Sequence, residues 1–191
     1  MINAGVDVGV FNDIDGQVRV NARDIGADEA DGLAPNQNDI AATALLSPLN
    51  GASVGNTAVI VPSASFTNYG VTTQTNVPVR FQILDSLNAV VYNQTATIPS
   101  IAQNAAATAS FPSTTLATAG TYTIKAIAEL AGDKTTANDT ITGTITVLPA
   151  FSGTINVGAG QTYTSLTNAG GLFEAFNVAG ASGAVTIDNQ Q

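Results

Sequence analysis

Apolar and polar residues alternate through most of the middle of this chain, and this alternation constrains the fold more than any other feature. It recurs between Asp39 and Val147, most clearly over Val77–Ile83 and Tyr122–Leu130. Successive side chains of a β-strand point to opposite faces of a sheet. A period of two residues therefore indicates strands with one buried and one hydrated face, as in antiparallel sheets. No segment of this region shows the period of a helix.

Turn-forming residues divide the alternation into separate strands, for example at Pro48–Gly51 and Asp85–Asn88. The expected strands cover residues 39–47, 57–68, 76–85, 89–98, 104–111, 120–131 and 139–148. Seven strands in about 100 residues predict an all-β fold of the immunoglobulin-like sandwich type. Tyr122 lies where many such sandwiches place a tyrosine corner, in which the hydroxyl bonds to the backbone upstream.

The flanking regions differ in composition from the sandwich. Eight acidic residues fall in the first 39 positions: Asp7, Asp13, Asp15, Asp24, Asp28, Glu29, Asp31 and Asp39. With the turn residues Gly32 and Pro35, this shift predicts three parts, at residues 1–33, 34–150 and 151–191. Apolar spacings of three and four predict a helix over about 164–177, capped by Thr164 or Ser165, between short strands at 153–157 and 184–188.

Composition excludes several classes of function. Only five basic residues are present, and they are scattered, which argues against binding to nucleic acid or to anionic lipid. The chain has no Cys and no His, so thiolate metal sites and the commonest general base are missing. No run reaches the roughly 18 apolar residues of a membrane span, and no membrane insertion is expected. A secretion signal, if one exists, lies outside this chain.

The middle region resembles the CARDB family, bacterial cell-adhesion-related domains of immunoglobulin-like fold. The matching stretches, in the family's order, are Asn38–Ala41, Phe66–Gly70, Val77–Phe81, Gly120–Ile124 and Asn138–Thr140. The resemblance covers about residues 38–148. It implies an extracellular location at the bacterial cell surface, a role in adhesion or spacing, and no catalytic residue.

The two flanking parts resemble fragments of right-handed β-helix modules of secreted bacterial proteins. Asn12–Gly16 and Asp24–Glu29 resemble the last coils of such a module, and Gly160–Leu166 resembles the start of another, with the 164–177 helix as its cap. The chain then consists of a β-helix end, a sandwich and a β-helix start. The resemblance implies a longer repetitive parent protein in which the modules alternate.

Acidic residues at the first boundary suggest calcium. The candidate ligands are Asp13, Asp15, Asp28, Glu29, Asp31 and Asp39. The first two precede a glycine at alternate positions, as at the start of a calcium loop, although the later Glu of an EF-hand is missing. The alternatives are an Asx-stabilised turn and a solvated acidic linker. For Asp133, Asn138 and Asp139 we expect structural hydrogen bonds within their loop.

Three functions remain open from the sequence. The leading hypothesis is a non-catalytic structural and adhesion module, whose unfinished terminal strands pair with a second copy or a neighbouring repeat in a head-to-tail fibre. The alternative is a carbohydrate-binding accessory module that binds surface glycans through Tyr69, Tyr92 or Tyr163. The third is a fragment of a polysaccharide lyase or hydrolase. The lack of paired acids with aromatic platforms argues against an enzyme.

Overall fold

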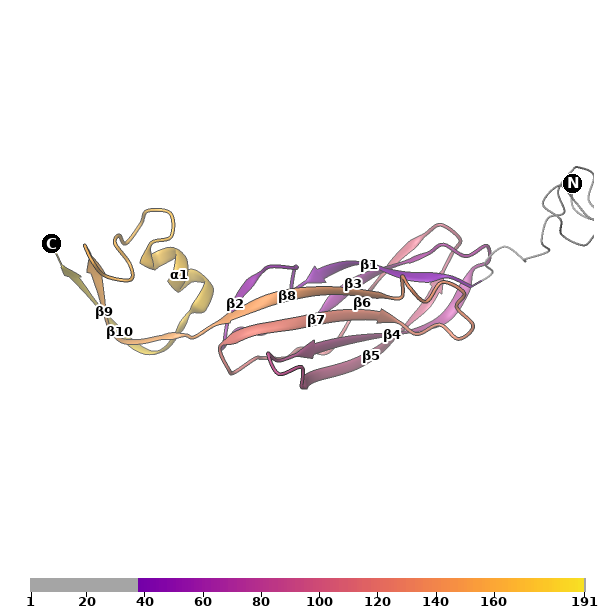
Figure 1. Cartoon of the computed structure of the whole chain (residues 1–191), viewed down its shortest axis with the longest axis horizontal. Helices are drawn as coiled ribbons and strands as arrows, with labels where there is room; N and C mark the ends of the chain where they lie inside the picture. The colour runs from indigo at the N-terminus through magenta and orange to yellow at the C-terminus, as the bar shows by residue number, and fades with distance from the viewer. Residues whose placement is uncertain (1–37, 191) are drawn as a thin grey trace, which may run out of the picture. The chain divides into compact units, whose positions relative to one another are not determined.

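The computed structural model describes residues 38–190, and these form an all-β, immunoglobulin-like sandwich followed by a small parallel layer (Figure 1). One sheet has the strand order β1-β3-β6 and the other β2-β8-β7-β4-β5. The elements of the sandwich are β1 (Ile40–Ser47), β2 (Ser53–Gly55), β3 (Ser63–Asn68), β4 (Gln74–Leu84), β5 (Val90–Ile101), β6 (Ala106–Ser110), β7 (Gly120–Ala128) and β8 (Thr140–Leu148). The fold class predicted from the alternation is confirmed.

Alternation along β4 and β7 builds the core between the two sheets. Val77, Val79, Phe81 and Ile83 are fully buried in the core. Phe81 packs against Phe111, the residue that follows β6, with ring centroids 5.5 Å apart. Buried positions alternate with exposed or half-buried ones along β3, β4, β7 and β8. Burial of these side chains is the main favourable contribution to folding.

The second predicted strand, at residues 57–68, is wrong at its start. Strand β3 begins only at Ser63, and the residues before it form a turn and a single bridge between Ile60 and Thr114. Pro62 has no N–H to give to a ladder, which favours a strand boundary here. The short strand β2 was not predicted, because three residues are too few for a visible alternation.

The tyrosine corner is present. The Tyr122 hydroxyl donates to the carbonyl oxygen of Thr118 at 2.8 Å, and the ring is buried. This hydrogen bond fixes the approach of the chain into β7.

Replacing Tyr122 with phenylalanine should lower the free energy of unfolding by about 1 kcal/mol, because the ring stays buried and one hydrogen bond is lost. Urea unfolding followed by circular dichroism measures this loss. Tyr69→Phe is the matched control, because Tyr69 is exposed. Equal losses in the two variants would contradict a role for the corner.

Residues 151–190 form a separate small layer of two parallel strands and a helix. Strand β9 (Phe151–Gly158) pairs with β10 (Ala181–Gln190), and α1 (Leu172–Ala179) connects them. Their register sets Ile155 beside Ile187. Both strands are longer than the predicted 153–157 and 184–188.

The predicted helix at 164–177 is wrong at its start, since α1 begins at Leu172. Gly170 has a φ of +74°, which breaks helical geometry. The Ser165 hydroxyl accepts hydrogen bonds from the N–H groups of Thr167 and Asn168, so it closes a turn before the helix. The expected capping role of Thr164 or Ser165 at the helix is therefore not observed, and Gly171 is the N-cap. Among the described residues no helix is long and apolar enough to cross a bilayer.

Candidate interaction sites at the two ends of the sandwich

A polar cluster occupies the end of the sandwich where the chain enters β1. Asp39 is only 6% exposed, and its carboxylate accepts a hydrogen bond from the Asn138 side chain at 2.9 Å. Asp133 accepts from the backbone N–H of Ile40 and of Thr135, each at 2.8 Å. The structural hydrogen bonding expected for Asp133 and Asn138 is thus confirmed, and it secures the first residues of β1. The same expectation fails for one side-chain oxygen of Asp139, which is buried without a partner among the described residues.

Of the six predicted calcium ligands, five lie outside the described residues: Asp13, Asp15, Asp28, Glu29 and Asp31. Asp39 is described, and Asn138 already bonds one of its carboxylate oxygens. Within residues 38–190, no three acidic side chains gather in an arrangement suited to a metal ion. Calcium at this boundary therefore stays a prediction.

Asp139 is the electrostatically disfavoured member of the cluster. Burial raises the pKa of its carboxyl group above the usual value, and the negative charges of Asp133 and Asp39 raise it further. One oxygen each of Asp139 and Asn138 is buried without a hydrogen-bond partner among the described residues. The folded protein consequently holds the Asp139 proton more tightly than the unfolded chain does.

This raised pKa predicts a pH dependence. The protonated form of Asp139 binds its proton more tightly in the folded state, and this adds to the free energy of unfolding. The contribution is complete below the unfolded-state pKa of about 3.9, and it is lost as the pH rises through the higher folded-state pKa of Asp139. Asp139→Asn should remove this loss, so the variant should be more stable than the parent at pH 7 and nearly equal to it at pH 3. Thermal unfolding across that range measures the difference.

The exposed Asp188 supplies the control for that experiment, since Asp188→Asn should leave the pH profile of the thermal midpoint unchanged. A difference between Asp139→Asn and the parent that stays constant with pH would contradict the electrostatic explanation.

At the opposite end, the Asn56 side chain and a close approach of Gly55 to α1 join the sandwich to the C-terminal layer and to the residues that lead into it. Asn56 donates to the carbonyl oxygen of Ala117 at 3.2 Å and accepts from the N–H of Ala150 at 3.0 Å. Gly55 lies against the last turn of α1, so close that a Cβ there would overlap the carbonyl group of Ala179. No local pattern in the sequence indicates this junction, because its contacts join residues about 60 to 125 positions apart.

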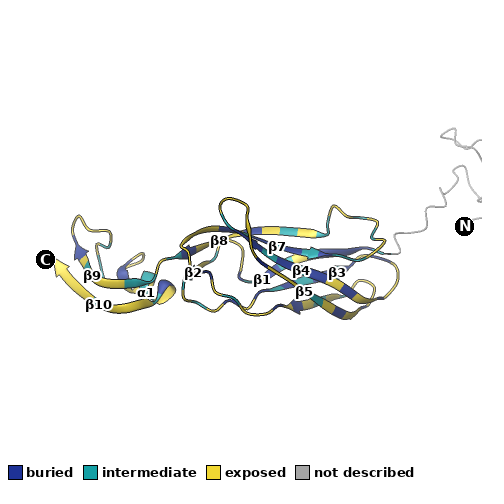
Figure 2. Cartoon of the chain, turned by 90° about the horizontal axis from the view of Figure 1, so that it is seen from below, coloured by how far each residue is buried: buried dark blue, intermediate teal, exposed yellow. Residues whose placement is uncertain are grey.

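The C-terminal layer has an open apolar groove between α1 and β10. The groove has a volume of about 160 Å³ and is lined by Phe173, Phe176, Val185 and Ile187. Phe173 is 49% exposed and Ile187 40%. All residues of β10 except Val185 are exposed, as the yellow strand in Figure 2 shows. The layer thus exposes apolar side chains, and within residues 38–190 strand β10 pairs with β9 alone, which leaves its other edge open.

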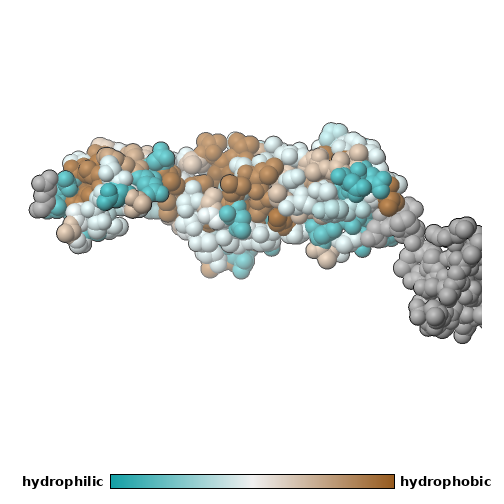
Figure 3. Space-filling model, turned by 90° about the horizontal axis from the view of Figure 1, so that it is seen from above, coloured by the Kyte–Doolittle hydropathy of each residue, from teal (hydrophilic) through white to brown (hydrophobic). Residues whose placement is uncertain are grey.

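A second apolar surface lies on the sandwich beside this junction. Leu46, Leu49, Val59 and Val61 are each 42% to 69% exposed and line a cleft of about 300 Å³. Figure 3 shows apolar atoms gathered on the sandwich toward the C-terminal layer. Exposed patches of this kind commonly mark interaction surfaces.

The three tyrosines predicted as sugar platforms differ in exposure. Tyr69 is 55% exposed. Tyr92 is buried, and its hydroxyl donates to the carbonyl oxygen of Pro112, so its assignment as a platform was wrong. Tyr163 is half-buried against Phe151, with ring centroids 5.9 Å apart. Only Tyr69 keeps the geometry that the carbohydrate hypothesis needs.

Comparison with known proteins gives structural similarity alone. No family profile and no curated protein matches the sequence. Among solved structures, a CARDB domain from Pyrococcus furiosus, in complex with di-metal ions, is 18% identical, with a TM-score of 0.47 over 61% of this chain and 94% of that one.

Two other solved structures show similar or weaker likeness. A domain assigned to a cell surface protein of Methanosarcina acetivorans is 22% identical, with a TM-score of 0.46 over 58% of this chain and 92% of that one. A β-glucosidase from Erythrobacter marinus is 15% identical, with a TM-score of 0.42 over 72% of this chain but 19% of the enzyme. Similarity at this level concerns the fold and carries no function.

Proposed function

We propose that the chain is a non-catalytic structural and adhesion module of a secreted bacterial surface protein. The observation that carries the proposal is the C-terminal layer, where an exposed strand, β10, borders an open apolar groove. A free parallel strand of this kind favours the addition of a further strand. We infer that β9, α1 and β10 form the first turn of a β-helix-like stack.

Residues 1–33 of a second molecule are the proposed continuation of this stack. Their sequence contains the alternating valines Val6, Val8 and Val10, a period that suits a strand. Addition of this segment to β10 would bury Ile187 and extend the parallel pair. Head-to-tail contacts give an open fibre when the rotation between copies does not close a ring, and a fibre is the product that we propose here.

Deletion of residues 1–33 tests the assembly. The full chain should give a series of large species in size-exclusion chromatography with light scattering, and the deletion variant should lose them. Ile187→Asp should have the same effect by placing a charge in the groove, whereas Thr186→Asp, on the neighbouring exposed position, should not. Assembly that survives both the deletion and Ile187→Asp would overturn the proposal.

Calcium at the acidic boundary is a separate part of the proposal. An ion shared by Asp39 and the acidic residues before it would stiffen the entry into β1 and offset the charges of Asp133 and Asp139. Added calcium should then raise the thermal midpoint at pH 7 and reduce its pH dependence, and a chelator should reverse both effects. No response to either addition would rule out this site.

Surface glycans remain a second candidate partner, supported by the exposure of Tyr69 in the turn after β3. Loss of glycan-array binding in Tyr69→Ala, but not in Val71→Ala two residues away, would support this function. If the parent chain binds no glycan on the array, a glycan-binding function is ruled out.

A further inference from the structure

The sandwich has four edge strands, and three of them are poorly suited to pairing with another chain. Strand β2 has three residues and β6 five. Strand β1 is interrupted by two register shifts, and the N–H groups of Ile40 and Ala42 already donate to Asp133 and Asn138. Short, irregular or covered edges are the usual protection against strand addition.

Strand β5 is the exception. It has twelve residues, lies along the lower rim of the sandwich in Figure 1, and has β4 as its only partner strand in the described part of the chain. Its one register shift lies near its start, opposite Ile83 and Leu84, and the pairing is regular from Tyr92 to Ile98. None of its residues is charged. The lysines and inward-pointing charges that commonly blunt such an edge are therefore missing.

The hydrogen-bond pattern shows which groups of β5 face outward. The Pro78 carbonyl accepts from the N–H of Glu129 at 2.9 Å, so the backbone of residue 78 faces β7. In antiparallel pairing these directions alternate, so Val79 and Phe81 bond to β5, opposite Ala96 and Gln94. The N–H and C=O groups of Asn93, Thr95 and Thr97 consequently point away from the sheet. A register shift skips Val91, and of its groups only the C=O is set outward, because it shares a peptide plane with the inward N–H of Tyr92.

Two observations support this assignment. Pro99 falls in the outward series, where its lack of an N–H costs no bond to β4. Within residues 38–190, the backbone groups of Asn93, Thr95 and Thr97 form no hydrogen bond with another segment. The edge is thus a row of unpaired donors and acceptors.

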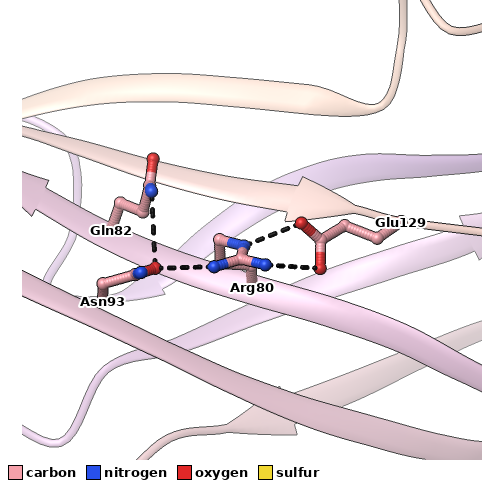
Figure 4. A network of polar contacts seen from close by, with 4 residues as sticks. All are labelled: Arg80, Gln82, Asn93 and Glu129. Atoms are coloured by element: carbon pink, nitrogen blue, oxygen red, sulfur yellow. Dashed lines mark hydrogen bonds and ion pairs between the residues drawn. The ribbon is translucent and has the colours of Figure 1, made fainter.

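The side chains beside this edge present no net charge. Arg80 and Glu129 form an ion pair (Figure 4), in which Nε and Nη2 of Arg80 donate to the two carboxylate oxygens at 2.7 and 3.3 Å. The third nitrogen, Nη1, donates to the side-chain oxygen of Asn93 at 3.1 Å. Gln82 also donates to the Asn93 oxygen, at 3.4 Å. This network fixes the outer face of β4 and β5 and neutralises the charge nearest the edge, so a second identical edge is not repelled.

We propose that β5 pairs with β5 of a second copy, antiparallel, about a two-fold axis at Gln94. This register sets Asn93 opposite Thr95 of the other copy and Val91 opposite Thr97. Every outward donor and acceptor of Asn93 and Thr95 is then paired, and the Val91 C=O lies opposite the Thr97 N–H. An axis one residue later would place Val91 opposite Pro99, which has no N–H to offer. The two five-stranded sheets become one continuous sheet, independently of the terminal segments.

A disulfide tests the register directly, because the full chain contains no cysteine. The two Gln94 residues form a non-hydrogen-bonded antiparallel pair, with Cα atoms about 4.5 Å apart, a distance that a disulfide spans. Gln94→Cys should therefore form a covalent dimer under mild oxidation at least about ten times faster than Thr121→Cys, an exposed position on the central strand β7. Equal rates would overturn the proposal.

Sedimentation of the full chain gives a second test. Thr95→Pro removes one outward N–H without breaking a bond to β4, so it should stay folded and raise the dimer dissociation constant about ten-fold or more. Deletion of residues 1–33 should leave this dimer intact, which separates it from head-to-tail assembly. A parent chain that stays monomeric at millimolar concentration would overturn self-pairing and leave the edge to an extended segment of another protein.

Discussion

Replacing Asn68 with alanine should lower the free energy of unfolding by about 3 kcal/mol. Asn68 is fully buried at the end of β3. Its side-chain nitrogen donates to the carbonyl oxygens of Thr72 at 2.8 Å and Ile101 at 2.9 Å, and its oxygen accepts from the N–H of Gly70 at 2.9 Å. Truncation removes three hydrogen bonds in a dry environment. Thr72 and Gly70 then keep only longer bonds, from the Gln74 side chain at 3.3 Å and to the Asp39 carbonyl oxygen at 3.2 Å, and weakening buried polar groups in this way costs more than the bonds themselves contribute. Urea unfolding monitored by circular dichroism measures the change.

Two further variants show which atoms of Asn68 matter. Asn68→Asp keeps an acceptor for Gly70, but it sets a buried carboxylate against two carbonyl oxygens, so it should be less stable at pH 7 than the alanine variant. Asn168→Ala is the control, because Asn168 is exposed. An aspartate variant as stable as the parent at neutral pH would show that the two donated bonds are dispensable.

The contrast between Asn68 and the central strands shows what a sequence of this kind reveals. Alternation in Val77–Ile83 predicts burial directly, because each residue's direction follows from its neighbours. The burial of Asn68 depends on Ile101, 33 positions away, and only the turn after it was visible in the sequence. Local periodicity therefore predicts the strands and their faces, whereas the polar groups that join loops depend on the folded structure.

The errors have the same physical origin. Tyr92 looked like an exposed platform, because an aromatic residue in an edge strand can face either way until the opposite sheet is known. The start of α1 was misplaced because Leu166 continues the apolar spacing, although Gly170 and Gly171 interrupt the helix. The edge of β5 was not recognised as a site, since sequence alone does not show which strand lacks a neighbour.

Replacing Gly55 with valine should separate the C-terminal layer from the sandwich. A Cβ at this position would overlap the carbonyl group of Ala179 and lie 2.9 Å from the carbonyl oxygen of Val178, and backbone atoms at a helix end cannot turn aside as a side chain does. Crowding of this kind costs about 1 to 3 kcal/mol. The cost should appear at the junction rather than in the core, because Gly55 ends the three-residue edge strand β2.

Hydrogen exchange read by mass spectrometry locates the effect. In Gly55→Val, the amides of α1 and β10 should exchange faster, while those of β4 and β7 keep their protection. Gly183→Ala is the control, because the nearest atom to a Cβ there lies 3.7 Å away, at ordinary contact distance. If the C-terminal layer acts in head-to-tail assembly while β5 pairs separately, Gly55→Val should weaken the large species and leave the Gln94→Cys cross-link unchanged. Loss of both would mean that the two contacts are not independent.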